Sequence, residues 1–242
     1  MAERQVRLHI DQPLRPGQAV ALSEGQANYL FAVMRLAVGA SVLLFNGQDG
    51  EWRAEVAEAG KRRGVLACRE QTKPQAMPPD LWLLFTPLRK ERTAFLVEKA
   101  VELGVARLCP VSTRYLAGDR LRADKERAHA VEAAEQCGAT FVPEVAEMQP
   151  LDRLLTGWDA ARRLYWADEG LAGQGADWPG SPGAPAAILI GPEGGFDPEE
   201  RKSLLALPGC LRLSLGPRIL RADTAAVAAL ALVQAVLGDG KA

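Results

Sequence analysis

Two glycine-rich segments, each placed directly after a short apolar run, most strongly constrain what this chain can fold into. Residues 186–190 are apolar, and GPEGGF follows at residues 191–196; residues 211–215 form a second run before Gly216 and Pro217. Both patterns predict a strand that ends in a tight turn and leads into a helix. In an open parallel sheet, ligands bind outside such strand ends. We therefore expect an α/β fold whose ligand pocket is built from these two loops.

The residues after each turn carry helix-start signals. Asp197 is a favourable N-cap, Pro198 suits the first helical position, and Glu200 stands at the capping-box spacing. After the second turn, Asp223 or Thr224 is expected to cap an alanine-rich helix that runs to residue 237. Small side chains allow close approach, so this helix is expected to pack tightly inside the domain or against a partner chain.

Common phosphate-binding patterns do not fit either loop. Neither has the lysine followed by serine or threonine of a P-loop, and GPEGGF differs from the dinucleotide fingerprint. A nucleotide-dependent enzyme that uses GPEGG as an anion nest is one interpretation, and it predicts a preference for ATP. The absent lysine argues against it. A purely structural glycine turn is the other alternative for one loop alone, and only the pairing of the two loops favours a functional site.

Five segments in order resemble one family. GPEGGF with LGPRILRADTA, LVEKAVELGV (residues 96–105), EAAEQCG (132–138) with VPEV (142–145), and YLFAVMRLAVGASVLLFNG (29–47) cover nearly the whole chain. Together they resemble the RsmE-type 16S ribosomal RNA uridine-N3 methyltransferases of the SPOUT superfamily. The resemblance implies methylation of N3 of a uridine in small-subunit ribosomal RNA, with S-adenosylmethionine (SAM) as the cofactor and a two-fold homodimer as the working unit.

The resemblance also implies a fold. Residues 1–72 would form a PUA-like RNA-binding β-barrel, and residues 73–242 a SPOUT domain with a parallel sheet and a deep trefoil knot. The residues themselves support two domains. Two alternating runs, 41–45 and 51–56, are joined by NGQDG, a hairpin signal, and the proline-rich segment 72–80 is a linker candidate. Beyond it, strand and helix patterns alternate as in a parallel sheet.

By resemblance, the cofactor would be bound largely by backbone groups of the two loops. Glycines suit this task because no side chain blocks the approach of an adenine edge to main-chain N–H and C=O groups. Apolar positions in the same loops have core packing as an alternative. The expected cofactor-binding residues are Ile190, Gly191, Glu193, Gly194, Leu215, Gly216, Ile219 and Leu220.

The implied chemistry requires help for a weak nucleophile, because N3 of uridine carries a proton. Arg221 is a candidate to stabilise negative charge on the uracil oxygens or to hold a phosphate. Asp223 is a candidate to orient Arg221 or to accept the proton, and Thr224 is a further catalytic candidate. For Asp223 and Thr224, helix capping alone is the alternative.

Two positions depart from the family pattern. Family members usually carry glutamate where this chain has Asp223, and many carry arginine where it has Ala139. The shorter Asp223 side chain puts its role as the base in doubt. A contact that the missing arginine would make must be absent or supplied elsewhere, with Arg114 as a candidate. These departures keep a second interpretation open: a non-catalytic RNA-binding or ribosome-assembly factor with the same fold.

The charge pattern allows local RNA contacts although the formal net charge is −1. Each candidate phosphate contact is a positively charged side chain near the predicted barrel or pocket. The alternative for each is a solvated surface residue without a role in RNA binding. They are Arg7, Arg35, Lys61, Arg62, Arg63 and Arg114.

The remaining features predict a cytoplasmic protein without a metal site. No apolar run approaches the length that spans a bilayer, and the polar start is unlike a signal peptide. The cysteines have no C-x-x-C spacing and only two histidines to assist them, which argues against zinc and a disulfide framework. We expect all of them to be buried packing residues: Cys68, Cys109, Cys137 and Cys210.

Overall fold

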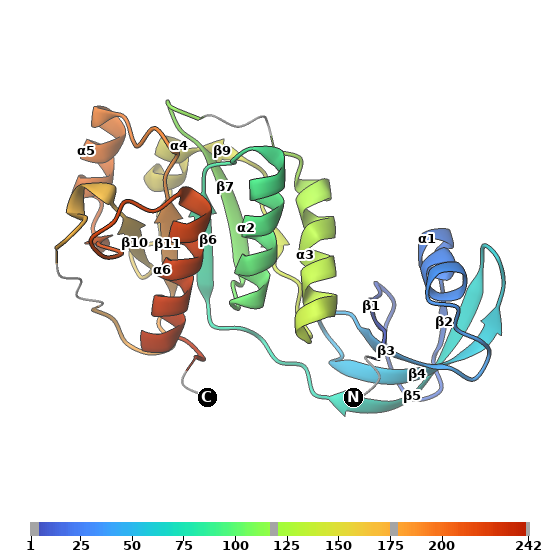
Figure 1. The fold of residues 1–242 in the computed structure, drawn as a ribbon. Coiled ribbons are helices and arrows are strands. Elements are labelled where there is room, and N and C mark those ends of the chain that lie inside the picture. The colour runs from blue at the N-terminus through green and yellow to red at the C-terminus, as the bar shows by residue number, and fades with distance from the viewer. Residues whose placement is uncertain (1–4, 117–120, 175–178, 241–242) are drawn as a thin grey trace. The chain divides into compact units, whose positions relative to one another are not determined.

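The structure, a computed structural model, describes residues 5–116, 121–174 and 179–240. It divides into two compact units (Figure 1). The first comprises residues 1–77 and 134–141, and the second residues 78–133 and 142–242. The expected boundary after residue 72 therefore lies slightly early, because β5 (Gly64–Lys73) still pairs with β4 at its last residue, Glu51 with Lys73. The return of residues 134–141 to the first unit was not predicted.

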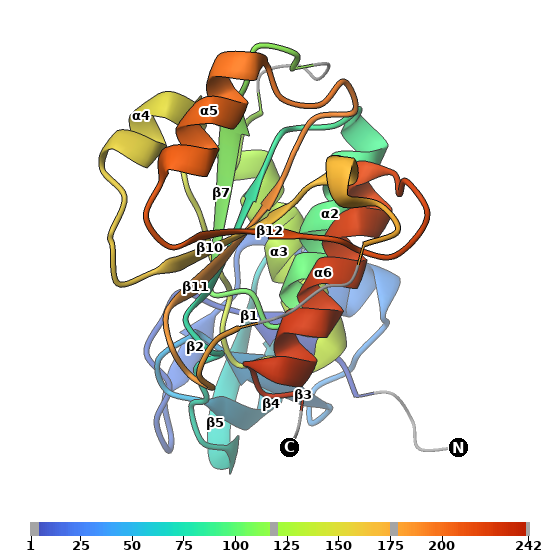
Figure 2. The same ribbon diagram turned by 90° about the vertical axis from the view of Figure 1, so that its left-hand side faces the viewer.

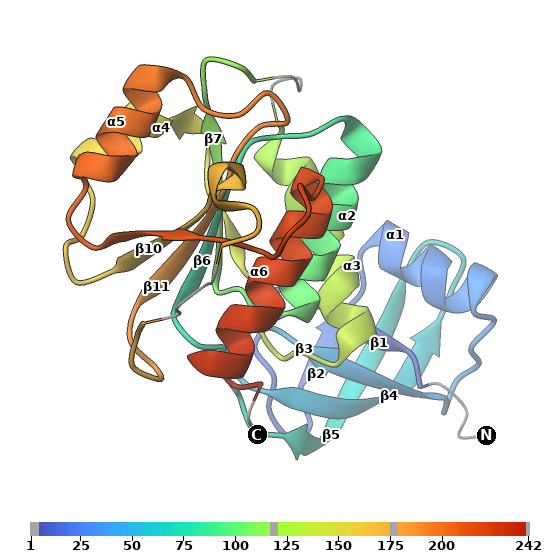
Figure 3. The same ribbon diagram turned by 60° about the vertical axis from the view of Figure 1, so that its left-hand side comes forward.

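The first unit is a curled sheet covered by a short helical element (Figure 3). Its elements are β1 (Arg7–His9), β2 (Ala19–Ala21), α1 (Glu24–Ala27), the π-helix η1 (Asn28–Val33), β3 (Ser41–Phe45), β4 (Glu51–Ala59) and β5. The strands follow the order β1-β3-β4-β5-β2, parallel between β1 and β3 and antiparallel elsewhere. The predicted hairpin is confirmed, and Gly47 and Gly50 in its loop have φ of 79° and 75°.

The core of the first unit explains its alternating sequence pattern. Val42 and Leu44 on β3 and Ala54 and Val56 on β4 are buried and point to one side, while their neighbours Arg53 and Glu55 lie outside this core. Leu30 of η1 is buried in the same cluster. The helical element is thus fixed to the curled sheet by its apolar side.

The second unit is a parallel sheet with helices on both faces (Figure 2). Its strands are β6 (Leu81–Phe85), β7 (Arg107–Ser112), β8 (Glu144–Val145), β9 (Gln149–Pro150), β10 (Arg163–Ala167), β11 (Ala186–Ile190) and β12 (Cys210–Leu213). The order is β12-β10-β11-β6-β7-β8, and β9 also pairs with β7. The expected alternation of strand and helix and the parallel sheet are confirmed.

The helices of this unit are α2 (Lys90–Glu102), α3 (Ala123–Cys137), α4 (Leu151–Thr156), the 3-10 turn η2 (Glu169–Leu171), α5 (Pro198–Ala206) and α6 (Ala222–Val236). The last turn of α3 belongs to the first unit. In Figures 1 and 2, α2 and α6 lie side by side on one face, and α4 and α5 lie on the other. The strand β11 between them is buried along its whole length. A strand covered on both faces needs apolar side chains throughout, which explains the continuous run AAILI.

Local signals predicted one helix start and missed another. At α5 the capping box is confirmed, with the Asp197 side chain and Glu200 each accepting a backbone N–H. At α6 the prediction is wrong: Arg221 is the N-cap, and Asp223 lies inside the first turn. The Asp223 carboxylate has another partner, described below.

The burial predicted for the cysteines holds for Cys68 and Cys109 but not for Cys137, which is exposed.

Candidate functional site

A cavity of about 460 Å³ opens at the carboxyl ends of β10, β11 and β12. The two glycine-rich loops, residues 191–195 and 215–221, form much of its wall. The structure therefore brings together segments that are separated in sequence. Every residue expected to bind the cofactor lines this cavity: Ile190, Gly191, Glu193, Gly194, Leu215, Gly216, Ile219 and Leu220.

Glycine serves a different purpose at each of two wall positions. A Cβ on Gly191 would lie 2.5 Å from Cε2 of Phe196, so this glycine lets the Phe196 ring fold back onto the loop. Phe196 is buried edge-on against Trp166, with ring centroids 5.5 Å apart. Gly216 instead adopts a φ of 104°, which side chains rarely tolerate. One glycine fixes the packing of its loop and the other fixes a backbone turn.

The end of β10 and the loop after it form a third wall that was not predicted from the sequence. It contributes Ala167, Asp168, Glu169 and Ala172. The available signal was the apolar strand before it, since parallel strands end at the same edge of a sheet. Only the two strands that are followed by glycine-rich turns were predicted to border the site.

Asp168 anchors this third wall. Its side chain is fully buried and accepts hydrogen bonds from Arg201 (3.0 and 3.1 Å), Arg212 (2.6 Å) and the Gly170 N–H (3.0 Å). Burial by itself would raise the pKa of Asp168, but the bonds from the two arginines outweigh burial and hold the pKa below its usual value. The carboxylate stays charged and holds β10, α5 and β12 together beneath the cavity.

Arg92 on α2 connects the two glycine loops. Its Nε and Nη2 each donate to one oxygen of Asp223 at 2.8 Å, and its Nη1 donates to Glu193. Glu193 lies in the first loop, and Asp223 lies just after the second. Arg92 was not predicted as a site residue, because a single arginine in a helix gives no signal of its distant partners.

This pairing gives Asp223 a partner other than the one expected from the sequence. Its partner is Arg92 rather than Arg221, and the hydrogen bonds from Arg92 lower the pKa of Asp223 to about 2. A carboxylate with so low a pKa is a weak proton acceptor near neutral pH. Arg221 is exposed and lines the cavity, whereas Thr224 is exposed and is not part of the lining.

Comparison with known proteins shows the family. The family model described as an RNA methyltransferase domain matches residues 75–234, and the RNA methyltransferase PUA domain matches residues 22–66. The chain belongs to the RNA methyltransferase family.

Individual relatives agree with this family membership. The ribosomal RNA small subunit methyltransferase E of Rickettsia conorii is 27% identical over 236 residues, with 94% of each chain covered. The crystal structure of the Neisseria gonorrhoeae ribosomal RNA small subunit methyltransferase E bound to S-adenosyl methionine has a TM-score of 0.85 at 26% identity, covering 98% of this chain and 99% of that one. A Legionella pneumophila protein in complex with SAM has a TM-score of 0.85 at 30% identity, covering 98% and 100%.

Arg7, one of the expected RNA contacts of this RNA methyltransferase, forms its hydrogen bonds inside the first unit. The Arg7 guanidinium donates to Glu51 (2.7 Å) and to the carbonyl oxygens of Ala134 (2.6 Å), Glu135 (2.9 Å) and Ala139 (2.8 Å). Its side chain is only 10% exposed. Arg7 thus caps the end of α3 within the first unit, where carbonyl groups lack helical partners, and this geometry does not favour a phosphate contact.

The other RNA candidates lie on the surface. Arg35, Lys61, Arg62 and Arg63 are exposed in the first unit, and the Arg62 Nε lies 3.4 Å from a carboxylate oxygen of Glu24. Arg114 is 72% exposed, lies 3.6 Å from the Asp197 carboxylate and does not line the cavity of the glycine loops. Its neighbour Tyr115 approaches Gly194 of the first loop: a Cβ on that glycine would lie 3.4 Å from the Tyr115 Cβ. Arg114 is therefore near the site without being part of its wall.

Within the described ranges no helix has the length and apolar character needed to cross a membrane. Over the same residues, no group of three or more histidine, cysteine, aspartate or glutamate side chains is arranged to hold a metal ion.

Proposed function

We propose that this protein transfers a methyl group from SAM to N3 of a uridine in 16S ribosomal RNA of the small subunit. The observation that carries the proposal is the single cavity made by the two glycine loops, in a chain of the RNA methyltransferase family. Similar proteins bound to SAM support the choice of cofactor, and the name of the Rickettsia relative supports the choice of RNA. The proposal places the protein in the cytoplasm with its ribosomal substrate.

The cavity suits SAM in size and in chemistry. Its volume of about 460 Å³ lies within the range of small-molecule sites. Leu213, Leu215, Ile219 and Leu220 offer apolar surface to an adenine ring, and the open backbone at Gly216 offers N–H and C=O groups to its edge. The deep trefoil knot is part of this proposal, since threading the second loop would hold it beside the first.

Residues of this chain would stabilise the negative charge that forms on the uracil during the reaction. SAM, when bound, supplies an electrophilic methyl group on a sulfonium. The exposed Arg221 guanidinium at the cavity would stabilise negative charge on the uracil oxygens as N3 loses its proton. Asp223 would hold Arg92 in place instead of accepting that proton, because its pKa of about 2 makes it a poor base.

The RNA-binding part of the proposal rests on exposed cations in both units. In the first unit these are Arg35, Lys61, Arg62 and Arg63, and in the second Arg114. Lysine and arginine side chains contact phosphates and release counterions, which gives a salt-dependent affinity.

We also propose a homodimer that uses the alanine-rich α6.

Primer extension tests the reaction directly. Small ribosomal subunits from a strain deficient in this methylation are incubated with the protein, with and without SAM. Methylation at N3 blocks the Watson–Crick edge, so reverse transcriptase should stop at one uridine only when SAM is present. The stop should vanish with Arg221→Ala and persist with Lys202→Ala, a control that removes an exposed cation from α5. Absence of SAM binding and of any stop would favour the non-catalytic RNA-binding factor instead.

A further inference from the structure

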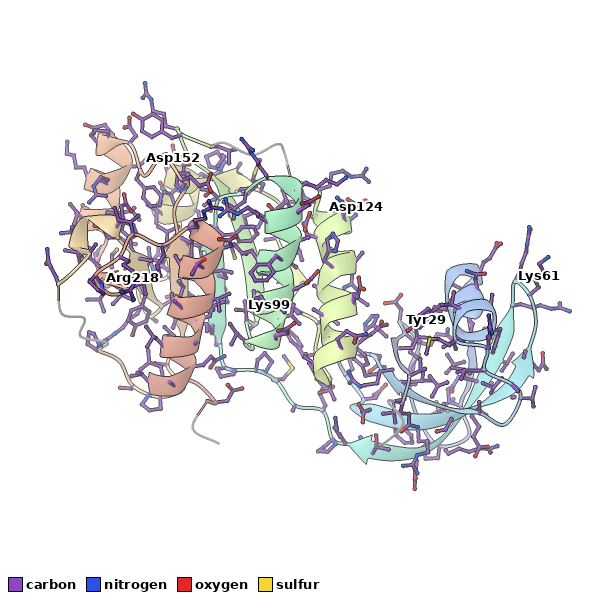
Figure 4. The ribbon with its side chains drawn as sticks, in the orientation of Figure 1. Tyr29, Lys61, Lys99, Asp124, Asp152 and Arg218 are labelled. Carbon is purple, nitrogen blue, oxygen red and sulfur yellow. The ribbon has the colours of Figure 1, made fainter. Side chains whose placement is uncertain are left out.

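A second cavity lies in the second unit, apart from the cavity of the glycine loops. Its volume is about 400 Å³, and its lining residues lie within 112–114, 150–155 and 197–203. The carboxyl end of β7 and the first turns of α4 and α5 therefore border it. Figure 4 labels Asp152 at this cavity and Arg218 in the second glycine loop, so the two cavities occupy different places in the unit.

The wall of the second cavity is acidic. Its described residues include four carboxylates, Asp152, Asp197, Glu199 and Glu200, and one guanidinium, that of Arg114. The Arg114 Nε lies 3.6 Å from Asp197 Oδ2, which is too far for a hydrogen bond. One loosely held guanidinium does not neutralise four carboxylates. The cavity therefore attracts cations and repels phosphates.

The carboxylates differ in how far the protein already uses them. Both oxygens of Glu200 accept backbone N–H groups, at 2.8 and 2.9 Å. Asp152 and Glu199 instead stand exposed in the first turns of α4 and α5. The Lys202 Nζ approaches a Glu199 oxygen to 3.7 Å, a distance that gives an exposed pair little strength. Asp152 and Glu199 are thus the carboxylates that a cation from outside can reach.

The cavity also has an apolar side and a hydroxyl without a partner. Leu151 and Leu155 of α4 line it and are buried. Thr113 lines it too, and its buried hydroxyl oxygen has no hydrogen bond with any residue in 5–116, 121–174 or 179–240. Proteins leave few buried polar groups unpaired, so this hydroxyl points to a polar group supplied from outside. Leucine surface beside carboxylates suits a cationic group on an aliphatic stem.

We propose that this cavity binds a lysine or arginine side chain of a basic protein on the small ribosomal subunit. The aliphatic stem lies on Leu151 and Leu155, the cationic head pairs with Asp152 and Glu199, and one of its N–H groups is accepted by the Thr113 hydroxyl. The inference rests on the proposed function, which supplies the ribosomal subunit. Proteins that bind RNA are rich in exposed lysine and arginine, whereas RNA itself would bring phosphates to an acidic wall.

Binding measurements on three ligands test this proposal. Fluorescence anisotropy would give the affinity of the labelled full-length protein for intact small subunits and for protein-free 16S RNA, and calorimetry its affinity for spermidine, a free polyamine. One variant combines Asp152→Asn with Glu199→Gln. A second, Ser203→Trp, fills the cavity and leaves its charge unchanged. The matched control combines Glu132→Gln with Glu147→Gln, which removes two exposed carboxylates of the same unit outside the cavity lining.

The expected changes have opposite signs for subunits and for RNA. Asp152→Asn with Glu199→Gln should weaken the affinity for intact subunits by about tenfold, and Ser203→Trp by a similar factor. The double variant should bind protein-free RNA as tightly as the original or up to about threefold more tightly, because it has lost negative charge. The control pair should bind subunits within about twofold of the original. Melting temperatures within about 4 °C of the original would show that each variant is folded.

Two outcomes would overturn the proposal: unchanged subunit affinity in both cavity variants, or equal losses for subunits and protein-free RNA. Spermidine binding that both variants abolish, with unchanged subunit affinity, would assign the cavity to a free polyamine and equally overturn it. Calorimetry with SAM tests the proposed function separately. An original protein that binds SAM but not small subunits would contradict the second cavity's role alone, and one that does not bind SAM would contradict the proposed methyl transfer.

Discussion

Arg92 donates two hydrogen bonds of 2.8 Å to the two carboxylate oxygens of Asp223, and a third N–H group reaches Glu193. One guanidinium on α2 thus joins the first loop of the cavity to the first turn of α6, which directly follows the second loop. Planar arginine suits this task because its N–H groups match a carboxylate in two-point geometry. Asp223 is therefore part of a three-residue arrangement with Arg92 and Glu193.

Replacing Arg92 with methionine should loosen the cavity. It leaves the Asp223 and Glu193 carboxylates without their shared cation, and we expect the free energy of unfolding to fall by about 1–3 kcal/mol, since the pair is partly exposed. SAM affinity, measured by calorimetry, should fall by about tenfold or more. Lys99→Met is the control, because Lys99 lies on the same helix and its ion pair is with Glu102, one helical turn away. Unchanged SAM affinity in Arg92→Met would contradict this role.

The Arg92–Asp223 pair should stabilise the protein at neutral pH and lose its effect in acid. Asp223 has a folded-state pKa of about 2, below the ordinary value near 3.8, so its stabilisation is complete above about pH 4 and disappears as the pH falls toward 2. At roughly 1.4 kcal/mol per pKa unit, the contribution is about 2 kcal/mol. Denaturant unfolding of the original protein and Asp223→Asn should differ by this amount at pH 7 and converge at low pH. A constant difference down to pH 3 or below would show that the carboxylate charge is not responsible.

Gly191→Ala should disturb the first loop through packing. The new Cβ would lie 2.5 Å from the Phe196 ring, which is itself held against Trp166. Overpacking of this kind typically costs about 1–3 kcal/mol, and displacing Phe196 should also weaken SAM binding. Thermal unfolding and calorimetry measure the two effects. Gly157→Ala is the comparison, since its Cβ would meet no atom within 4 Å; equal effects of both substitutions would refute the steric explanation.

The proposed dimer can be tested at Leu232, a residue of α6 that is 41% exposed. Leu232→Arg should convert dimers to monomers in analytical ultracentrifugation and remove most methylation activity, because a charge on an apolar interface is costly to bury. Leu205→Arg changes a 58% exposed leucine on α5 and should leave the assembly intact. Fully active Leu232→Arg monomers would rule out a dimer as the working unit.

Sequence patterns predicted several of the elements but not all of their ends. The apolar run at residues 186–190 and the capping box at Asp197 each depend on near neighbours in the chain, and the structure has both. The prediction that Asp223 or Thr224 caps α6 was wrong, because capping propensity considers only near neighbours in the chain. The Asp223 carboxylate instead accepts hydrogen bonds from Arg92, which is 131 positions away in sequence. Arg7 was misjudged for the same reason, since its partners include carbonyl groups at the end of α3.

The sequence by itself determined the strand and helix order, the glycine turns and the residues of the two loops, because periodicity, capping and backbone freedom are properties of short segments. Only the tertiary structure decided which distant charges meet: Arg92 with Asp223 and Glu193, Asp168 with Arg201 and Arg212, and Arg7 with Glu51. An ion pair depends on the positions of two side chains in space, and those positions are fixed only when the sheet order has been set. The chain therefore specified where a pocket would form, and its packing specified which side chains hold that pocket in shape.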